Sequence, residues 1–195
     1  MNTFQQLKDH LLLKVPLTEE EASGILSCFK EKKIKRKQYI IQPEYIAKSR
    51  NYVVQGSFRA FVIDKNGIDY TIQFAVEDWW ISDYNSYVNQ TPATMFVEAL
   101  EDSIILQIEY ESEKRLKASS HKYETLFRIM AERSASFHQR RIISSLTESA
   151  EERYNEFVDK YPDVVLRLPQ YALASYLGMT TGFLSKIRND KLKKR

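Results

Sequence analysis

"ASYLGMTTGFLSKIRN", residues 174–189, contains two short helical patterns that meet at a glycine. Apolar residues lie on both sides of this glycine, at the spacing that two steeply crossing helices need to share a core: Ala174, Leu177, Leu184 and Ile187. Gly178 tolerates the left-handed backbone conformation that commonly ends a helix, and Thr180 is placed to cap the next one. The stretch therefore predicts a helix-turn-helix. The same pattern also occurs in ordinary helical hairpins, and the pattern alone leaves both interpretations open.

The second helix of this bend offers a polar and basic face. Its polar side chains can reach phosphates or base edges in a major groove: Thr181, Ser185, Lys186 and Arg188. Helix N-terminal amides attract phosphate as well. The net charge of the chain is only +3, yet residues 186–195 hold six Lys or Arg residues against one Asp. The basic excess therefore gathers where the bend predicts contact with DNA.

The composition is typical of a folded globular chain. Of the 195 residues, 43% are hydrophobic and 28% are charged, so the chain is expected to be neither disordered nor fibrous. The single cysteine, Cys28, excludes an internal disulfide and a cysteine-based zinc or iron–sulfur site, which fits a reducing compartment. The first twenty residues lack the features of a signal peptide, and no apolar run reaches the roughly 18 residues of a membrane span. We expect a cytoplasmic protein with no membrane partner.

Short segments rich in Val, Ile, Tyr, Phe and Thr occupy residues 32–109 and are separated by turn signals such as Asn66-Gly67. Several short strands at close spacing indicate a sandwich or jelly roll. The basic run at residues 30–38 overlaps the start of this region and is interpreted mainly as a solvated strand and loop rather than as a nucleic-acid contact.

Residues 121–146 form a long helical pattern without Gly or Pro. One seam recurs at alternating spacings of four and three: Tyr123, Phe127, Met130, Ser134 and Phe137. That spacing keeps a seam facing a partner helix and predicts a homodimer through this helix. The alternative is an ordinary amphipathic helix that packs on its own domain.

The order of these parts, a β-roll, a long helix and a terminal bend with a basic tail, resembles the Crp/Fnr family of transcriptional regulators. The resemblance extends over nearly the whole chain. It is most specific in residues 167–189 and in "WWISDYNSYVNQTPATMFVEALEDS", residues 79–103, which lies where the family keeps its ligand-binding cassette.

The resemblance implies an α+β fold in three parts. Residues 1–118 would form an antiparallel β-roll of the jelly-roll or cupin-like kind, similar to cyclic-nucleotide-binding domains and acting as a sensor. Residues 119–148 would form the dimerisation helix, and residues 149–195 the helix-turn-helix DNA-binding domain with its basic tail. Such a dimer would place two recognition helices in successive major grooves about 34 Å apart, so a roughly palindromic site and salt-dependent binding are expected.

The residues that open and line the family's recognition helix fall on Thr181, Gly182 and Lys186. The DNA-binding residues implied by the resemblance and the bend are Thr180, Thr181, Gly182, Ser185, Lys186 and Arg188. Many relatives carry Arg and Glu at the first two family positions, whereas here one side chain is short and the other is absent. We expect direct readout of bases to be weaker or aimed at different bases. No β-hairpin wing follows before residue 195, and the tail "KLKKR" is expected to contact phosphates instead.

The ligand cassette lacks the cation that a cyclic nucleotide needs. In the family, the cyclic phosphate is held by an Arg, by a neighbouring Ser or Thr and by backbone amides. Here Ala93 stands at the Arg position and Thr94 at the hydroxyl position, and no Arg or Lys occurs between residues 69 and 107. Upstream, Glu77 is not preceded by the family's Gly. Because a buried phosphate requires a paired cation, the sequence predicts no tight binding of cyclic AMP.

Five residues are candidates for lining a different ligand pocket: Arg59, Trp79, Trp80, Tyr84 and Thr94. Arg59 is the one neighbouring basic residue that could point inward, with the solvent face as the alternative because Arg is rarely buried. The aromatic residues would suit an apolar or aromatic effector, or they are simply part of the core.

No enzymatic site is expected. None of the three histidines, His10, His121 and His138, falls in a predicted strand, and their spacing does not fit a metal site. No Gly-rich phosphate loop or nucleophile elbow occurs, so neither a metal nor a cofactor is predicted. The prediction is a sequence-specific DNA-binding regulator that acts as a homodimer without gating by cyclic AMP. The alternative is a ligand-sensing or structural dimer of the same fold that has lost DNA binding. The expected partners are double-stranded DNA, a second copy through residues 121–146 and, if there is one, an unidentified small-molecule effector.

Overall fold

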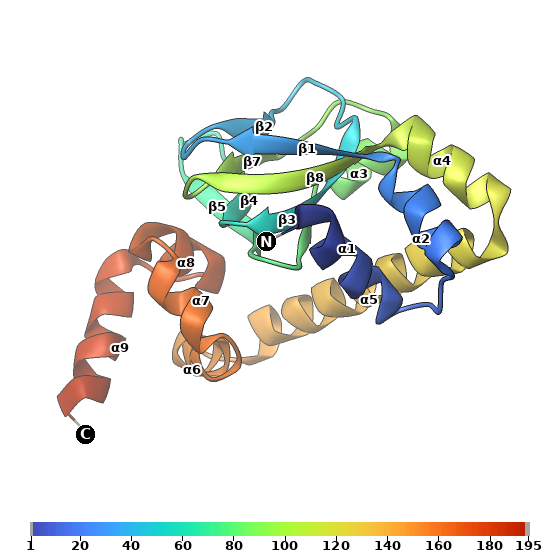
Figure 1. Cartoon of the computed structure of the whole chain (residues 1–195). Coiled ribbons are helices and arrows are strands. Elements are labelled where there is room, and N and C mark those ends of the chain that lie inside the picture. Colours follow the sequence, from blue (N-terminus) through green and yellow to red (C-terminus); the bar gives the residue numbers. More distant parts are fainter. Residues whose placement is uncertain (1, 194–195) are drawn as a thin grey trace.

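The structure of the chain is a computed structural model that describes residues 2–193, with side chains described for residues 2–190 (Figure 1). Within these residues nine helices and eight strands follow one another. The strands are β1 (Phe29–Ile34), β2 (Tyr39–Ile41), β3 (Ser49–Gln55), β4 (Phe58–Ile63), β5 (Asp69–Ala75), β6 (Trp80–Ile81), β7 (Phe96–Ala99) and β8 (Ser103–Glu109). The helices are α1 (Thr3–Leu12), α2 (Glu19–Leu26), α3 (Tyr84–Asn89), α4 (Tyr110–Ser119), α5 (His121–Thr147), α6 (Ala150–Lys160), α7 (Pro162–Arg167), α8 (Gln170–Leu177) and α9 (Thr181–Lys193).

The strands form two four-stranded antiparallel sheets, in the orders β1-β8-β3-β6 and β2-β7-β4-β5. Neighbours such as β1 and β8 are far apart in the sequence, as in a jelly roll. The inner faces of both sheets share one apolar core, which includes Val53, Phe58, Ala60, Val97 and Ile105. The predicted α+β fold with an antiparallel β-roll is confirmed. The division into three domains at residues 118 and 148 stays a prediction.

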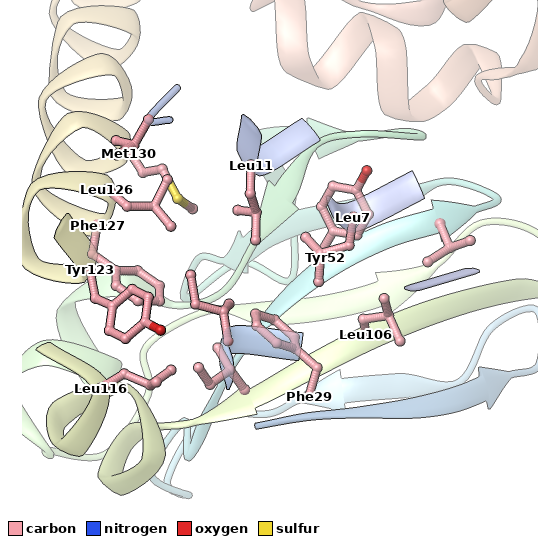
Figure 2. Packing of buried hydrophobic residues seen from close by; sticks show 14 residues of the cluster. Leu7, Leu11, Phe29, Tyr52, Leu106, Leu116, Tyr123, Leu126, Phe127 and Met130 are labelled. Carbon is pink, nitrogen blue, oxygen red and sulfur yellow. The ribbon is translucent and has the colours of Figure 1, made fainter. Parts of the chain in front are cut away.

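Two helices that the sequence did not predict, α1 and α4, flank the roll. Leu7 and Leu11 of α1 are buried between the roll and α5. Figure 2 shows them in the same cluster as Tyr52 of β3 and Met130 of α5. The N-terminal helix therefore fills part of the space between the roll and α5.

The first half of α5 packs on its own domain. Tyr123, Leu126, Phe127 and Met130 are buried in the cluster that includes α1 and the roll (Figure 2). Further along the predicted seam, Ser134 and Phe137 line a cavity beside the roll. For Tyr123, Phe127 and Met130 the prediction that the seam faces a partner helix is wrong, because α1 and the roll cover this part of the stripe and it packs on its own domain. For Ser134 and Phe137 it stays a prediction.

The C-terminal helices have a separate core. Ala174, Leu177, Leu184 and Ile187 are all buried in it, as the sequence predicted, together with Tyr154, Phe157, Val165 and Leu168. The same cluster reaches Phe74 of β5 and Leu100. The hydroxyl of Ser175 in α8 accepts a hydrogen bond from the Thr71 N–H at 2.9 Å and donates one to the Asp69 carbonyl at 2.8 Å. Helix α8 is therefore fixed to the edge of the roll at β5.

We expect Gly56→Ala to destabilise the chain by about 3 kcal/mol or more. Gly56 lies in the turn between β3 and β4 with φ +99°, and an added Cβ would lie 2.1 Å from Ser103 Oγ. Gly67→Ala is the matched control, because φ is +81° there but no heavy atom lies within 4 Å of the added Cβ; we expect a loss of about 1 kcal/mol. Urea unfolding followed by circular dichroism measures both losses. Equal losses would show that the contact with Ser103 has no effect on stability.

Candidate nucleic-acid interface and ligand cavity

The turn between α8 and α9 has the geometry that the sequence predicted. Gly178 takes the left-handed conformation, with φ 68° and ψ 39°. Its N–H donates to the Ser175 carbonyl at 3.2 Å, and the Met179 N–H donates to the Ala174 carbonyl at 3.0 Å. These two bonds make a Schellman ending for α8. Thr180 Oγ1 accepts a hydrogen bond from the Phe183 N–H at 3.1 Å and so caps α9.

The predicted DNA-binding residues differ in solvent exposure. Thr180, Thr181, Gly182 and Lys186 are exposed at the start of α9. Ser185 is half-buried, and its hydroxyl is already used: it donates to the Thr181 carbonyl at 3.0 Å and accepts from the Gln170 side chain. Arg188 is half-buried, with its guanidinium 6.0 Å from the ring of Tyr154. The side chains of the tail "KLKKR" lie outside the described part of the chain.

Two residues near this face were missed by sequence reasoning. Phe183 is 43% exposed beside the polar face of α9, and an apolar ring there could meet a thymine methyl group. Arg153 of α6 donates from Nε and Nη2 to the Leu177 carbonyl at 3.0 and 2.9 Å. A cation at the end of α8 stabilises the unpaired carbonyls of its last turn. The exposed aromatic residue could have been noticed in the helical pattern, but nothing in the sequence connects Arg153 with α8.

Two arginines hold the C-terminal helices against the rest of the chain. Arg141 of α5 donates to the carbonyls of Thr71 and Tyr176 at 3.1 and 2.9 Å, and its guanidinium lies 3.7 Å from the centre of the Tyr176 ring. Burial lowers the pKa of Arg141. On the other side, Arg167 of α7 pairs with Glu77 at 2.7 Å and with Glu101 at 2.6 Å. Hydrogen bonding to Glu77 raises the pKa of Arg167.

A buried carboxylate occupies the cassette. Asp83 is the N-cap of α3 and is fully buried. Its Oδ1 accepts from the Ser86 N–H at 3.0 Å, and its Oδ2 accepts from the N–H groups of Thr94 and Met95 at 2.9 and 3.2 Å. The backbone amides beside Ala93, at the place that the resemblance assigns to a cyclic phosphate, are therefore already used by an anion of the chain itself. A phosphate placed there would meet a like charge.

Arg59 lies neither in a ligand pocket nor in solvent. Its neighbours in β4, Phe58 and Ala60, face the core of the roll, so Arg59 points from the outer face of the sheet. There it is buried and pairs with Glu98 at 3.0 Å and Asp69 at 2.7 Å. The prediction of Arg59 as a pocket residue is wrong, and so is its solvent-facing alternative. Helix α8 explains this burial, since the ring of its Tyr171 lies 4.9 Å from the Arg59 guanidinium.

Three of the predicted pocket residues do meet at one cavity. Trp79, Trp80 and Tyr84 line a cavity of about 590 Å³ between α1, the β5–β6 region and α5. Thr94 is exposed at the cassette and is not among the residues that line it. Trp80 also packs on Tyr52, with ring centroids 5.3 Å apart, so the aromatic residues contribute to the core as well as to the cavity. These side chains therefore belong to the core and also line the cavity, and their role in binding an effector stays a prediction.

The cavity has an electropositive wall. Lys14 Nζ lies 2.6 Å from His10 Nε2, which also accepts from the Trp80 indole N–H at 3.3 Å. Burial, and then the charge of Lys14, lower the pKa of His10 to about 4, so this ring is neutral at pH 7. Burial, followed by the charge of Arg133, lowers the pKa of Lys14 to about 8. The lysine keeps its proton at neutral pH, beside a second cation that also lines the cavity.

Comparison with known proteins identifies the fold but no annotated relative. No family model and no curated protein matches the sequence. Solved structures do match, among them FixK2 from Bradyrhizobium japonicum, at 15% identity over 85% of each chain with a TM-score of 0.73. The c-di-GMP-responsive global regulator CLP from Xanthomonas campestris matches at 9% identity over 91% of this chain and 93% of its own, with a TM-score of 0.72. A CooA mutant from Carboxydothermus hydrogenoformans matches at 18% identity over 95% and 84%, with a TM-score of 0.69.

These neighbours are Crp/Fnr-family transcription regulators, so the resemblance in the sequence is confirmed in the structure: the chain has the Crp/Fnr fold. The neighbours are regulators rather than enzymes. In residues 2–193 no group of three or more His, Cys, Asp or Glu side chains is arranged to hold a metal ion. None of the described helices combines the length and the apolar character needed to cross a membrane.

We expect Asp83→Ala to destabilise the chain by about 3 kcal/mol, because three N–H groups at a buried site would lose their acceptor. Asp64→Ala is the matched control. Asp64 also accepts two backbone N–H groups, from Asn66 and Ile68 at 2.8 and 2.9 Å, but in an exposed turn where water can replace it. A clearly smaller loss is expected there. The free energies of unfolding in urea test the difference, and a loss at Asp83 no larger than that at Asp64 would contradict the structural role of the buried carboxylate.

Proposed function

We propose that the chain is a cytoplasmic, sequence-specific DNA-binding transcription regulator of the Crp/Fnr type, which acts as a homodimer and is not gated by cyclic AMP. The observation that carries the proposal is the Schellman-closed bend, which leaves Thr180, Thr181, Gly182 and Lys186 exposed at the start of α9. A helix presented in this way fits a major groove, with its N-terminal residues toward the base edges. In this proposal residues 149–195 form the DNA-binding domain.

The dimer is proposed to use a different face of α5 from the one that the heptad spacing suggested. Ile142 and Leu146 are 60% and 79% exposed, and they lie seven and eleven residues after the exposed Ala135. At about 100° per residue, this stripe lies roughly a third of the way around the helix from the buried seam. Spacings of seven and four suit a helix–helix seam, and such large exposed apolar side chains favour a partner. Ile143, 52% exposed, lies beside the stripe.

The charges in the cassette support the proposed absence of gating by cyclic AMP. Asp83 uses the amides of Thr94 and Met95, and Ala93 brings no cation. A cyclic phosphate would have to displace a carboxylate from three hydrogen bonds and would gain no ion pair from position 93 in return.

Leu146→Asp is expected to convert the dimer into monomers, because a charge in an apolar helix seam must be desolvated. Leu166→Asp is the control, since Leu166 on α7 is equally exposed, at 83% against 79% for Leu146. We expect the control to remain a dimer. Sedimentation equilibrium gives the mass of each variant. Monomers with the wild-type sequence, or an intact dimer with Leu146→Asp, would refute the proposed interface.

The double variant Lys186→Ala/Arg188→Ala is expected to lose at least about tenfold in affinity for a cognate duplex and about two units of the salt slope, while the dimer stays intact. The duplex is first selected from a random pool without cyclic nucleotide, and a roughly palindromic site is expected. Lys32→Ala/Lys33→Ala removes two exposed charges from β1 and should leave both quantities unchanged. Adding cyclic AMP should not change the wild-type affinity.

One observation favours the alternative function, a ligand-sensing or structural dimer without DNA binding. Gly182 places no side chain at a position that the resemblance assigns to base contact, and nothing lies within 4 Å of an added Cβ there. If the random pool yields no site and the two double variants bind DNA equally weakly, this alternative replaces the proposed function.

A further inference from the structure

We propose that the cavity lined by Trp79, Trp80 and Lys14 is a binding site for a planar aromatic carboxylate, separate from the position at Ala93 and Thr94 that the resemblance assigns to a cyclic phosphate. Asp83, Ala93 and Thr94 do not line this cavity, and Asp83 already occupies the amides of the cassette. The fold therefore contains two distinct places, one closed by its own anion and one open. At about 590 Å³ the open cavity lies within the usual range for small-molecule sites.

The walls of the cavity select for a flat, apolar body. Trp79, Trp80, Phe137 and Tyr161 bring aromatic rings to it from the roll, from α5 and from the end of α6. The Trp79 and Tyr161 rings meet edge to face, with centroids 5.2 Å apart. Aromatic walls gain most from a planar ligand that can stack against a face or meet an edge.

The charges of the cavity select for an anion. Lys14 and Arg133 line it from α1 and α5, and neither forms an ion pair among the described residues. One carboxylate, Asp78, also lines it. Asp78 Oδ1 already accepts from the Tyr52 hydroxyl at 2.5 Å and the Gln6 amide at 2.9 Å. The balance is positive, and the mutual repulsion of Lys14 and Arg133 that helps lower the pKa of Lys14 would be relieved by a bound carboxylate.

A third cation carries an unused donor. Arg50 lines the same cavity, is only 5% exposed and pairs with Glu113 through Nη2 at 3.2 Å. Its Nε–H has no hydrogen-bond partner in the protein. A buried donor without an acceptor is unfavourable, and a carboxylate in the cavity would be a suitable acceptor.

A ligand bound at this site would act on the C-terminal helices. This coupling rests on the proposed function. Tyr161 joins α6 to α7, and its ring also packs on Phe157, with centroids 5.3 Å apart, in the core that carries α8 and α9. A ligand that contacts Trp79 and Tyr161 from within the cavity would therefore act on the helices that are proposed to bind DNA.

The test uses 2-naphthoate, with 2-naphthamide as its neutral isostere, on the full chain. The chain contains only two tryptophans, and both line the cavity, so tryptophan fluorescence reports on the site directly. We expect saturable binding of one naphthoate per chain in fluorescence and calorimetry, and at least about tenfold weaker binding of the amide. Non-saturable binding, or equal affinity for naphthoate and naphthamide, would overturn the proposal.

Arg133→Gln should weaken binding of naphthoate at least about fivefold and leave binding of naphthamide unchanged. Arg128→Gln is the matched control, because Arg128 is an exposed arginine of the same helix that does not line the cavity. Equal effects of the two substitutions would mean that only surface charge attracts the anion, and would overturn the site.

The effect of naphthoate on the affinity of the chain for the selected duplex is measured as a separate step. A change in DNA affinity at constant ionic strength supports coupling through Tyr161, and an unchanged affinity overturns the coupling but not the site. If no duplex is bound at all, the proposed function fails while the fluorescence and calorimetry results still decide the site.

Discussion

The packing of the first half of α5 against its own roll is the contact on which the other features depend. Tyr123, Leu126, Phe127 and Met130 lie in one cluster with α1 and β3, and this fixes the direction in which the long helix leaves the roll (Figures 1 and 2). That face is used internally, and the exposed apolar residues Ile142 and Leu146 near the end of α5 lie on a different face. The same packing leaves a space between α1, the β5–β6 region and α5 that becomes the cavity. This intramolecular contact thus determines which face of α5 stays exposed, where the cavity lies and where the C-terminal helices are positioned.

The cassette keeps a frame that suits an anion, but the anion that fills it belongs to the chain itself. Backbone N–H groups at Thr94 and Met95 still converge on one point, and Asp83 provides the negative charge from within the chain. Once an internal carboxylate satisfies those donors, a cation at position 93 is not needed to hold a ligand, and the small Ala93 is buried there. The positive charges lie instead around the cavity beside the two tryptophans, at the junction of the roll, α5 and the end of α6.

Features set by local chemistry could be predicted from the sequence. Gly178 and Thr180 act through hydrogen bonds to residues within a few positions, so the turn between α8 and α9 could be predicted. The many β-branched and aromatic residues in 32–109 were enough to indicate a roll. Features set by distant neighbours could not be predicted. The periodicity of α5 gives an apolar stripe without saying whether α1 or a second chain covers it. Arg59 was misplaced because its burial requires Glu98, Asp69 and a helix more than a hundred residues later. Periodicity and local motifs carry no signal for such contacts.

The two arginines that hold the C-terminal helices respond differently to the surrounding solution. Arg167 relies on ion pairs with Glu77 and Glu101, and all three side chains are about one third exposed, so mobile ions weaken this attachment. Arg141 instead binds two carbonyl oxygens and an aromatic face in a largely buried position, where screening is slight. As ionic strength rises, one attachment therefore loosens while the other persists. The contact of α7 with Glu77 and Glu101 is therefore the part of the C-terminal attachment that salt weakens, whereas α8 stays bonded to β5 through Ser175 and Arg141.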